Sequence, residues 1–275
     1  MIASGTAVAL GDARDEWELG GKAVQLGAAI RAGLPVPEGA ALPAPLVAAV
    51  AAGDPAAVAE LSVVRGCLPG PLAVRSSCAG EDSAAASFAG QHLTCLNVRS
   101  AEQLINAVTA VWHSGQNESA LGYRRKLGLE DEPKMGVVVQ ALVEPEVAGV
   151  LFTRHPVTGA DERVIEATWG LGESVVQGLV MPDLYRIHPS GEAIERRPGR
   201  KQVAIRSLPS GGTSEQPVAG DLVDEPCLDD RQLALLHDLA RRCEAAFEGP
   251  SDVEWAFANQ ALYLLQRRAI TRKPA

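Results

Sequence analysis

Polar and apolar residues alternate along two short runs near the C-terminus, residues 252–257 and 262–268. The runs flank a short polar segment, residues 258–261, and this pattern predicts a β-hairpin. If the turn is centred on Gln260, the hairpin pairs the residues of the two runs that lie at equal distances from it in sequence. Successive side chains of a strand point to opposite faces, so the pattern also sorts the residues into a polar and an apolar face.

Four polar side chains are expected on one face, with Asp252 opposite Arg268 and Glu254 opposite Gln266. The expected core face carries Val253, Trp255, Tyr263 and Leu265. Two carboxylates and an amide oxygen are suitable ligands for Mg²⁺, and a guanidinium can bind phosphate. The alternative is a solvated ladder of ion pairs on an ordinary surface hairpin.

Apolar periodicity predicts helices over residues 43–64, 101–123 and 229–247, the last starting at an Asp cap. Continuous apolar runs at residues 72–77, 137–143, 148–153 and 164–169 predict buried strands. Residues 207–224 are rich in Gly, Pro and Ser, which predicts a mobile surface loop. The expected fold class is therefore α+β.

The chain has 275 residues and 47% hydrophobic content, enough for one large domain or two lobes with a core. A net charge of −9 without a basic stripe predicts no nucleic-acid binding. We also expect no membrane span and a cytoplasmic location, because the N-terminus lacks a secretory pattern and no apolar stretch approaches about 18 residues. The cysteines show no CxxC pairing and are expected to be reduced thiols.

Two positions carry groups suited to an anion. Gly20-Gly21-Lys22 precedes a helical pattern, where free N–H groups and a lysine could bind phosphate, although such a lysine is often simply solvated. Arg75 ends a buried strand and needs an anion, which Glu81 or Asp82 could also supply.

Three further segments have both a structural and a functional interpretation. The small residues of 83–91 could form a mobile lid or an ordinary loop, and the Gly170-Leu171-Gly172 turn could be a phosphate cradle or a plain turn. Glu166 interrupts an apolar strand, which is costly without a cation or metal partner.

Together these motifs resemble the N-terminal ATP-binding domain of the phosphoenolpyruvate synthase, pyruvate phosphate dikinase and rifampin phosphotransferase family. The matching motifs run in family order along nearly the whole chain: Gly20-Gly21-Lys22-Ala23, Val74-Arg75-Ser76-Ser77, Ala86-Ser87-Phe88-Ala89-Gly90-Gln91, Gly149-Val150-Leu151-Phe152-Thr153, Pro156-Val157-Thr158-Gly159, Glu166-Ala167-Thr168-Trp169-Gly170-Leu171-Gly172-Glu173, Asp252-Val253-Glu254-Trp255 and Leu265-Gln266-Arg267-Arg268.

The resemblance implies an ATP-grasp fold with two lobes and the nucleotide in the cleft between them. Residues 1–139 would form the N-terminal lobe and residues 140–275 the C-terminal lobe. ATP and Mg²⁺ are the implied cofactors.

The resemblance also implies roles for individual residues. Lys22 and Arg75 would contact the ATP phosphates, and Gly90 and Thr94 would belong to a lid over the triphosphate. Arg268 would stabilise the phosphoryl group in transfer, so that Arg268, Arg75 and Lys22 form the implied catalytic set.

Further implied roles concern the base and the metal. Gln140 and Leu142 would border the adenine, although Leu142 stands where the family often has methionine. The implied metal ligands are Glu254 and Gln266, with Asp252 and Glu166 as nearby acids.

Three functions remain open from the sequence. The first is an ATP-dependent phosphotransferase acting on a small-molecule acceptor. The second is one part of a split dikinase that phosphorylates a histidine on a separate partner protein, giving AMP and phosphate; the chain ends at Ala275 and lacks the family's Thr-Ser-His-Ala-Ala motif. The third is a non-catalytic ATP-binding regulatory module. His155 is the histidine nearest to the expected site, and it could also be a plain loop residue.

Overall fold

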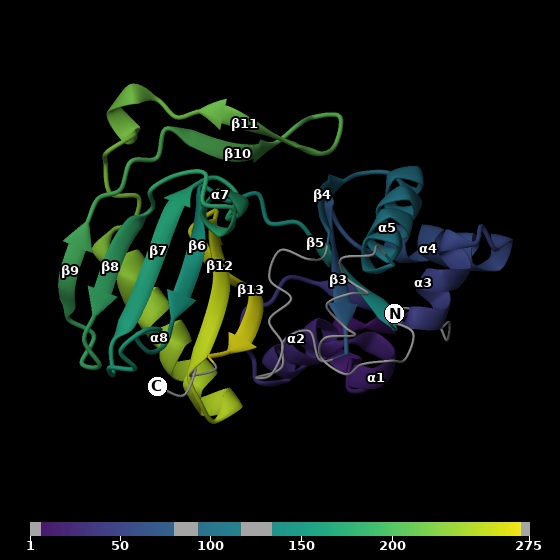
Figure 1. Cartoon of the computed structure of the whole chain (residues 1–275), viewed down its shortest axis with the longest axis horizontal. Coiled ribbons are helices and arrows are strands. Elements are labelled where there is room, and N and C mark those ends of the chain that lie inside the picture. The colour runs from purple at the N-terminus through teal and green to yellow at the C-terminus, as the bar shows by residue number, and fades with distance from the viewer. Residues whose placement is uncertain (1–6, 80–92, 117–133, 271–275) are drawn as a thin grey trace. The chain divides into compact units, whose positions relative to one another are not determined.

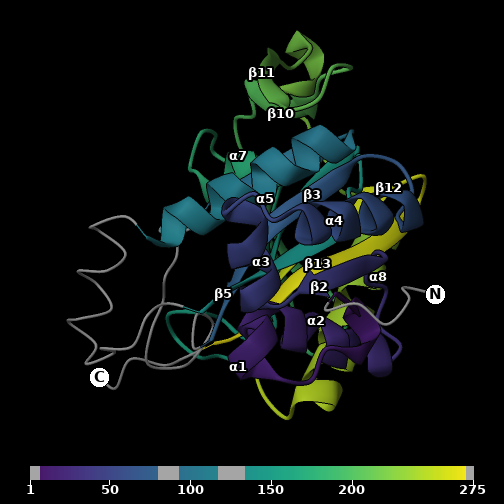
Figure 2. The ribbon, with the colours of Figure 1, turned by 90° about the vertical axis from the view of Figure 1, so that its right-hand side faces the viewer.

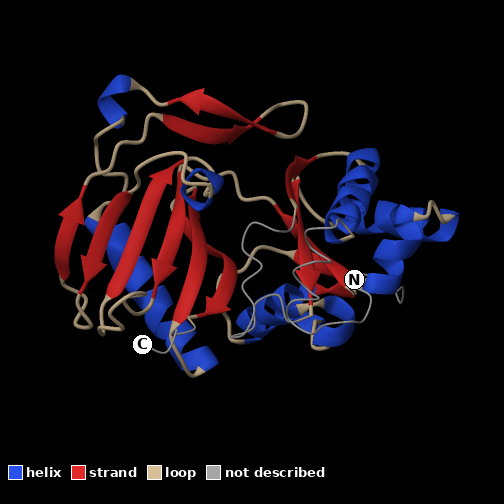
Figure 3. Ribbon diagram, in the orientation of Figure 1, coloured by secondary structure: helices blue, strands red, loops and turns tan. Residues whose placement is uncertain are grey.

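The computed structural model describes residues 7–79, 93–116 and 134–270. The chain divides into two compact units. Unit 1 comprises Met1–Arg31, Pro37–Leu142 and Leu208–Gly212, and unit 2 comprises Ala32–Val36, Val143–Ser207 and Thr213–Ala275. Each unit combines helices with antiparallel strands, so the predicted α+β class is confirmed (Figure 3). This organisation is consistent with the ATP-grasp fold that the resemblance implies.

Unit 1 is built on a five-stranded antiparallel sheet of order β1-β2-β5-β3-β4. Its strands are β1 (Val8–Ala9), β2 (Gly39–Leu42), β3 (Leu72–Cys78), β4 (Thr94–Val98) and β5 (Met135–Ala141). Its helices are η1 (Leu10–Asp12), α1 (Glu16–Leu19), α2 (Gly21–Arg31), α3 (Ala44–Ala51), α4 (Pro55–Cys67) and α5 (Ala101–Gly115). Helices α3, α4 and α5 cover one face of the sheet, while α1 and α2 contact β3 and β5 (Figure 2).

The helical run predicted over residues 43–64 is two helices. Gly53 adopts a φ of 78°, which ends α3, and the Asp54 carboxylate accepts hydrogen bonds from the N–H groups of Ala56 and Ala57, both at 2.9 Å, which starts α4. No single helix among the described residues is long and apolar enough to cross a membrane; α3 and α4 reach that length and composition only as a pair bent by 113°.

Unit 2 contains a six-stranded antiparallel sheet of order β13-β12-β6-β7-β8-β9 and a separate two-stranded sheet, β10-β11. The strands are β6 (Val147–Phe152), β7 (Arg163–Trp169), β8 (Asp183–Ile187), β9 (Ala193–Arg197), β10 (Val203–Ser207), β11 (Thr213–Pro217), β12 (Ser251–Ala258) and β13 (Ala261–Ala269). The helices are α7 (Glu173–Val176), η2 (Gly220–Leu222) and α8 (Asp230–Phe247). Helix α8 crosses one face of the large sheet and contacts β12 and β6 (Figure 1).

Helix α8 starts where the sequence predicts. Asp229 caps it by accepting from the Gln232 N–H at 2.7 Å, and the Gln232 side chain accepts from the Asp229 N–H at 2.9 Å, which completes a capping box. The apolar side of the helix is buried, with Leu233, Leu236, Leu239, Ala240 and Cys243 inside. This face holds α8 against the sheet.

The prediction of a mobile loop over residues 207–224 is wrong. Residues 213–217 form β11, which pairs with β10 from Ser207↔Thr213 to Val203↔Pro217. The prediction failed because this strand is polar and shows little apolar alternation. Hydrogen bonding to β10 makes it a strand, and such a pairing leaves no signal in local composition.

A buried ion pair lies at the start of β8. Lys201 and Asp183 are both fully buried, and Lys201 Nζ lies 2.5 Å from Asp183 Oδ1. The carboxylate also accepts from the N–H groups of Gly199 and Cys227, at 2.7 and 2.8 Å, and from the Tyr185 hydroxyl at 3.3 Å. Burial raises the pKa of the Tyr185 hydroxyl and of the Cys227 thiol, and the charge of Asp183 raises both pKa values further. The carboxylate therefore ties the segment after β9 and the segment before α8 to the sheet.

Candidate functional site

The C-terminal hairpin has the predicted pairing at its polar positions. Asp252 pairs with Arg268 and Glu254 with Gln266 across β12 and β13. Because directly opposite residues share a face, the four side chains lie on one face of the sheet. The structure thus confirms that the hairpin brings two acids, an amide and a guanidinium together.

The predicted turn centre and part of the predicted core face are wrong. The turn consists of Asn259 and Gln260, with φ values of 50° and 64°, and a bulge between Trp255 and Glu254 then shifts the pairing by one residue. As a result, Leu264 stands opposite Trp255 and is fully buried. Tyr263 and Leu265, which the alternation places in the core, are only partly buried.

Glu166 lies in the same cross-strand row as the hairpin acids. Gln266, Glu254, Val150 and Glu166 are successive partners on β13, β12, β6 and β7. Glu254 and Glu166 are two strand spacings apart, which puts their Cα atoms about 9–10 Å from each other. The opposite face carries Val253 and Arg267, on the side where α8 packs. The structure therefore places the acids Asp252, Glu254 and Glu166 on the face of the sheet that α8 does not cover.

The side chains of Gln266 and Arg268 contact each other. When the Gln266 amide is oriented with its oxygen toward the guanidinium, that oxygen accepts from Nε and Nη2 of Arg268 at 2.8 and 2.7 Å. Both hydrogen bonds end on the amide oxygen, so they hold the Gln266 side chain against the guanidinium.

The donor set suits Mg²⁺ held together with a phosphate ligand. In the described part of the chain, no group of three or more His, Cys, Asp or Glu side chains could hold a metal ion by itself. Mg²⁺ is commonly bound through one or two carboxylates together with substrate phosphates and water, without an all-protein cage. Glu254, with Gln266 opposite it and Asp252 and Glu166 nearby on the same face, fits that mode of binding.

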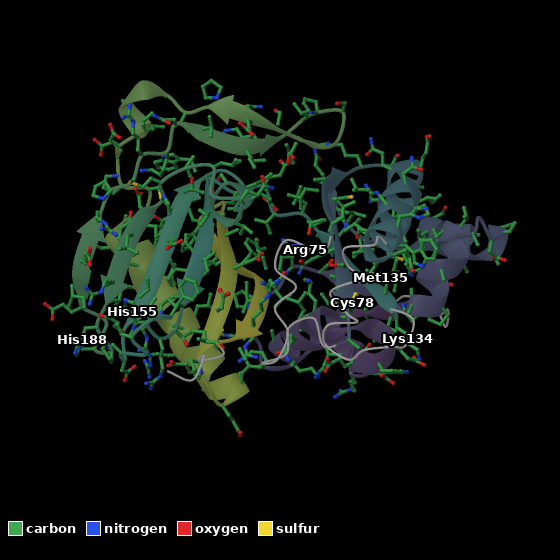
Figure 4. The ribbon with its side chains drawn as sticks, viewed as in Figure 1. Arg75, Cys78, Lys134, Met135, His155 and His188 are labelled. Atoms are coloured by element: carbon green, nitrogen blue, oxygen red, sulfur yellow. The ribbon has the colours of Figure 1, made fainter. Side chains whose placement is uncertain are left out.

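In unit 1, the second group of predicted residues lies on the face of the sheet away from α3 and α5. Arg75 on β3 pairs with Thr94 on β4 and Val138 on β5. On the same strand, Val74 and Cys78 point to the helical core, where Cys78 Sγ lies 3.2 Å from Met135 Sδ (Figure 4). Arg75 is 7% exposed, so its guanidinium is largely withdrawn from solvent. Thr94 shares its face and is exposed.

Lys22 lies on this same face, at the first turn of α2. Gly20 has a φ of 82°, and a Cβ there would stand 1.9 Å from the Ser77 carbonyl oxygen, so only glycine fits the close approach to β3. Ser77 Oγ accepts from the Ala23 N–H at 3.0 Å and caps the helix start. Lys22 is only 4% exposed, which excludes a simply solvated lysine.

The predicted base-binding residues have structural contacts of their own. Gln140 is 1% exposed, and its Nε2 donates to the Pro37 carbonyl at 3.3 Å, which holds the segment before β2. The N–H of Leu142 donates to the Pro71 carbonyl at 2.8 Å. Gly90 and the rest of the 83–91 lid segment lie outside the described residues, so the lid role stays a prediction. The adenine role of Gln140 and Leu142 also stays a prediction.

Two other sequence candidates have local explanations. In the turn after β6, His155 Nδ1 accepts from the N–H groups of Val157 and Thr158 at 3.2 and 3.3 Å, and Nε2 lies 4.0 Å from Glu162 Oε1 (Figure 4). Gly170 has a φ of 73° and precedes a helix of only four residues. Both features are accounted for by turn geometry.

One buried charged residue of the hairpin was not predicted from the sequence. Arg267 is 6% exposed and lies on the α8 side, next to Arg268 in sequence but on the other face. The signal was present, since strict alternation puts one of two consecutive arginines inside.

Residues 42–275 match the family described as pyruvate phosphate dikinase, AMP/ATP-binding domain, and the chain belongs to this family. Over 201 residues it is 40% identical to a rifampicin phosphotransferase from Streptomyces sviceus, covering 72% of this chain and 23% of that protein. It is 39% identical over 202 residues to a probable phosphoenolpyruvate synthase from Methanothermobacter thermautotrophicus, covering 73% of this chain and 29% of that protein. The chain thus spans about a quarter of the length of these curated relatives.

Among solved structures, the chain overlays on dinucleotide-forming acetyl-coenzyme A synthetase 1 from Ca. Korarchaeum cryptofilum with a TM-score of 0.49 and 12% identity. The overlay covers 98% of this chain and 95% of that one.

Proposed function

We propose that this chain binds Mg²⁺-ATP and transfers a phosphoryl group from it to a small-molecule acceptor. The observation that carries the proposal is the polar face of the hairpin, where Glu254, Gln266, Asp252 and Arg268 lie together with Glu166 in the same sheet. Membership of an AMP/ATP-binding domain family supports the nucleotide.

The proposed chemistry divides among the residues by charge. Glu254 and Gln266 would hold Mg²⁺, with Asp252 and Glu166 as nearby acids, and the bound ion would neutralise phosphate charge. Phosphoryl transfer depends mainly on positioning and charge stabilisation, since little covalent chemistry is left to the protein. Arg268 would stabilise the phosphoryl group in transfer.

Unit 1 would contribute to the same reaction through its two buried cations. Lys22 and Arg75 lie on one face of the unit 1 sheet and would contact the phosphates. Their positive charges would attract the negatively charged phosphates of ATP. Thr94 and Gly90 would belong to the lid, and Gln140 and Leu142 would border the adenine.

The family name favours a second candidate, a dikinase in which the acceptor is a histidine on a separate protein. The products would then be AMP and phosphate. The third candidate, a binding module without turnover, is weaker because pure binding does not require the whole charged set.

Product analysis distinguishes the candidates. We expect the purified protein, incubated with Mg²⁺-ATP and a panel of small acceptors, to form ADP and a phosphorylated acceptor in equal amounts, measured by anion-exchange chromatography. Glu254→Gln, which keeps the side-chain shape and removes the charge, should abolish product formation.

Two outcomes would count against the first candidate, and a third would count against the assigned site. AMP with phosphate, formed only when a histidine-bearing protein is supplied, would support the dikinase. Bound ATP recovered unchanged with every acceptor would support the regulatory module. Equal turnover in Glu254→Gln would contradict the assigned site.

A further inference from the structure

The buried guanidinium of Arg267 connects three parts of unit 2. Its Cζ lies 4.2 Å from the ring centroid of Phe247, in the last turn of α8, and its Nε donates to Ser251 Oγ at 2.9 Å. A guanidinium stacks well on an aromatic face and needs a hydrogen-bond partner when it is withdrawn from water. Arg267 has both, so it fastens β13 to α8 and to the start of β12.

Ser251, which accepts the hydrogen bond from Arg267, is itself held in place by two hydrogen bonds to Thr153. Ser251 and Thr153 are both fully buried. The Ser251 N–H donates to Thr153 Oγ1, and the Thr153 N–H donates to the Ser251 carbonyl, both at 2.9 Å. Through Ser251, Arg267 is therefore fixed to the end of β6 as well as to β12.

The bulge makes this attachment important. From the turn to Trp255, the pairing runs from Ala258↔Ala261 to Trp255↔Leu264. Beyond the bulge, the next pair is Glu254↔Gln266, so one residue of β13 is skipped. If the first register simply continued, Asp252 would stand opposite Arg267, and Arg268 would stand opposite Ser251 on the α8 side. A one-residue slip moves every side chain to the other face, so it would remove Arg268 and Gln266 from the polar face.

Several contacts on the α8 side exist only in the observed register. The Arg267 guanidinium meets Phe247 and Ser251 there, and the slip would instead bury the Gln266 amide opposite Val253. Arg267 lies between Gln266 and Arg268 in sequence. Its contacts with Phe247 and Ser251 therefore hold both neighbouring residues in place on the other face.

We propose that Arg267 is a positioning residue for phosphoryl transfer: it fixes β13 so that Gln266 and Arg268 stand opposite Glu254 and Asp252. This inference rests on the proposed function. It assigns Arg267 no contact with substrate, and it predicts an effect on kcat out of proportion to any effect on folding.

Arg267→Met tests the proposal, because methionine keeps an unbranched side chain over Phe247 and removes the hydrogen bond to Ser251. We expect kcat to fall by about 10- to 100-fold, since small misplacements of reacting groups can cost about 100-fold. The KM for Mg²⁺-ATP should change by less than about 3-fold, because nucleotide binding draws on many contacts. Arg267→Lys, which keeps a cation near Phe247 and Ser251, should recover part of the lost kcat.

Two further variants separate positioning from stability. Leu236→Ala, in the buried face of α8, should lower the melting temperature at least as much as Arg267→Met and leave kcat within about 2-fold of wild type. Ser251→Ala should lower kcat, and combining it with Arg267→Met should add little, because both remove the same hydrogen bond.

The outcomes are distinguishable. If the wild type transfers phosphate and Arg267→Met retains its kcat, or loses kcat only as Leu236→Ala does, the positioning role is overturned while the proposed function stands. If the wild type forms no product with any acceptor, the proposed function itself fails. Should Arg267→Met not fold, the kcat values of Arg267→Lys and Ser251→Ala decide the question in the same way.

Discussion

Replacing Arg268 with alanine is expected to lower kcat by roughly 1,000-fold or more, while the Kd for Mg²⁺-ATP rises by less than about 10-fold. The guanidinium faces Asp252 and donates to the oxygen of Gln266, so it is held on the polar face of the hairpin before any ligand binds. A fixed cation of this kind acts mostly on charge that develops in the transition state, and arginines in phosphoryl-transfer enzymes contribute about 10³–10⁵ in rate. Single-turnover kinetics and isothermal titration measure the two effects separately.

Two substitutions serve as controls for this experiment. Arg268→Lys keeps the charge and loses the two-pronged contact with Gln266, so we expect it to recover only a small part of the rate. Arg206→Ala, at an exposed position of β10, should leave kcat unchanged. Equal losses of rate and affinity in Arg268→Ala would contradict a role centred on the transition state.

Asp183→Ala should lower the free energy of unfolding by about 3–5 kcal/mol, because it leaves the buried ammonium of Lys201 without its counter-ion. The same substitution removes the acceptor for the N–H groups of Gly199 and Cys227 and for the Tyr185 hydroxyl. Chemical denaturation followed by circular dichroism measures the loss.

The two members of the buried ion pair are expected to differ in how much their replacement lowers stability. Lys201→Met should cost less than Asp183→Ala, because the carboxylate keeps three other donors. Asp230→Ala removes the surface pair with Arg196 and should change stability by less than about 1 kcal/mol. If Asp183→Ala were as mild as Asp230→Ala, the buried pair would not hold unit 2 together as described.

The polar pairs of the hairpin could be predicted from the sequence because strand alternation and a short turn constrain the register. Asp252↔Arg268 and Glu254↔Gln266 are both observed. The reason given for these pairs was incomplete. The turn consists of Asn259 and Gln260 and is not centred on Gln260, and the bulge between Trp255 and Glu254 then restores the predicted pairing. A bulge depends on how β13 meets its neighbours, and the alternation of apolar residues does not encode it.

Elements that depend on distant partners were not predictable in the same way. Strand β11 is polar and forms through pairing with β10. The buried partners Asp183 and Lys201 are 18 residues apart in sequence, with no motif to connect them. Local patterns identify elements with a strong apolar face, whereas partners across a sheet follow from tertiary structure.

The candidate site was predictable only in part from the sequence. The polar and charged residues that each unit gathers on one face were predicted: Lys22 and Arg75 in unit 1, and Glu254, Gln266 and Arg268 in unit 2. The contacts that hold these residues were not, such as the Ser77 cap on α2 or the hydrogen bond of Arg267 to Ser251. Those contacts join segments that are far apart in sequence.

Titration of the purified protein with ATP, in the presence and absence of Mg²⁺, tests the central claim most directly. We expect saturable binding of Mg²⁺-ATP with a Kd below about 1 mM, at least 10-fold tighter with the metal than without it. In Glu254→Gln the advantage given by Mg²⁺ should fall below about 3-fold, because a metal ligand has been lost. Absence of binding at several millimolar Mg²⁺-ATP, or a metal dependence that survives in Glu254→Gln, would contradict the assignment of the hairpin face as the magnesium-nucleotide site.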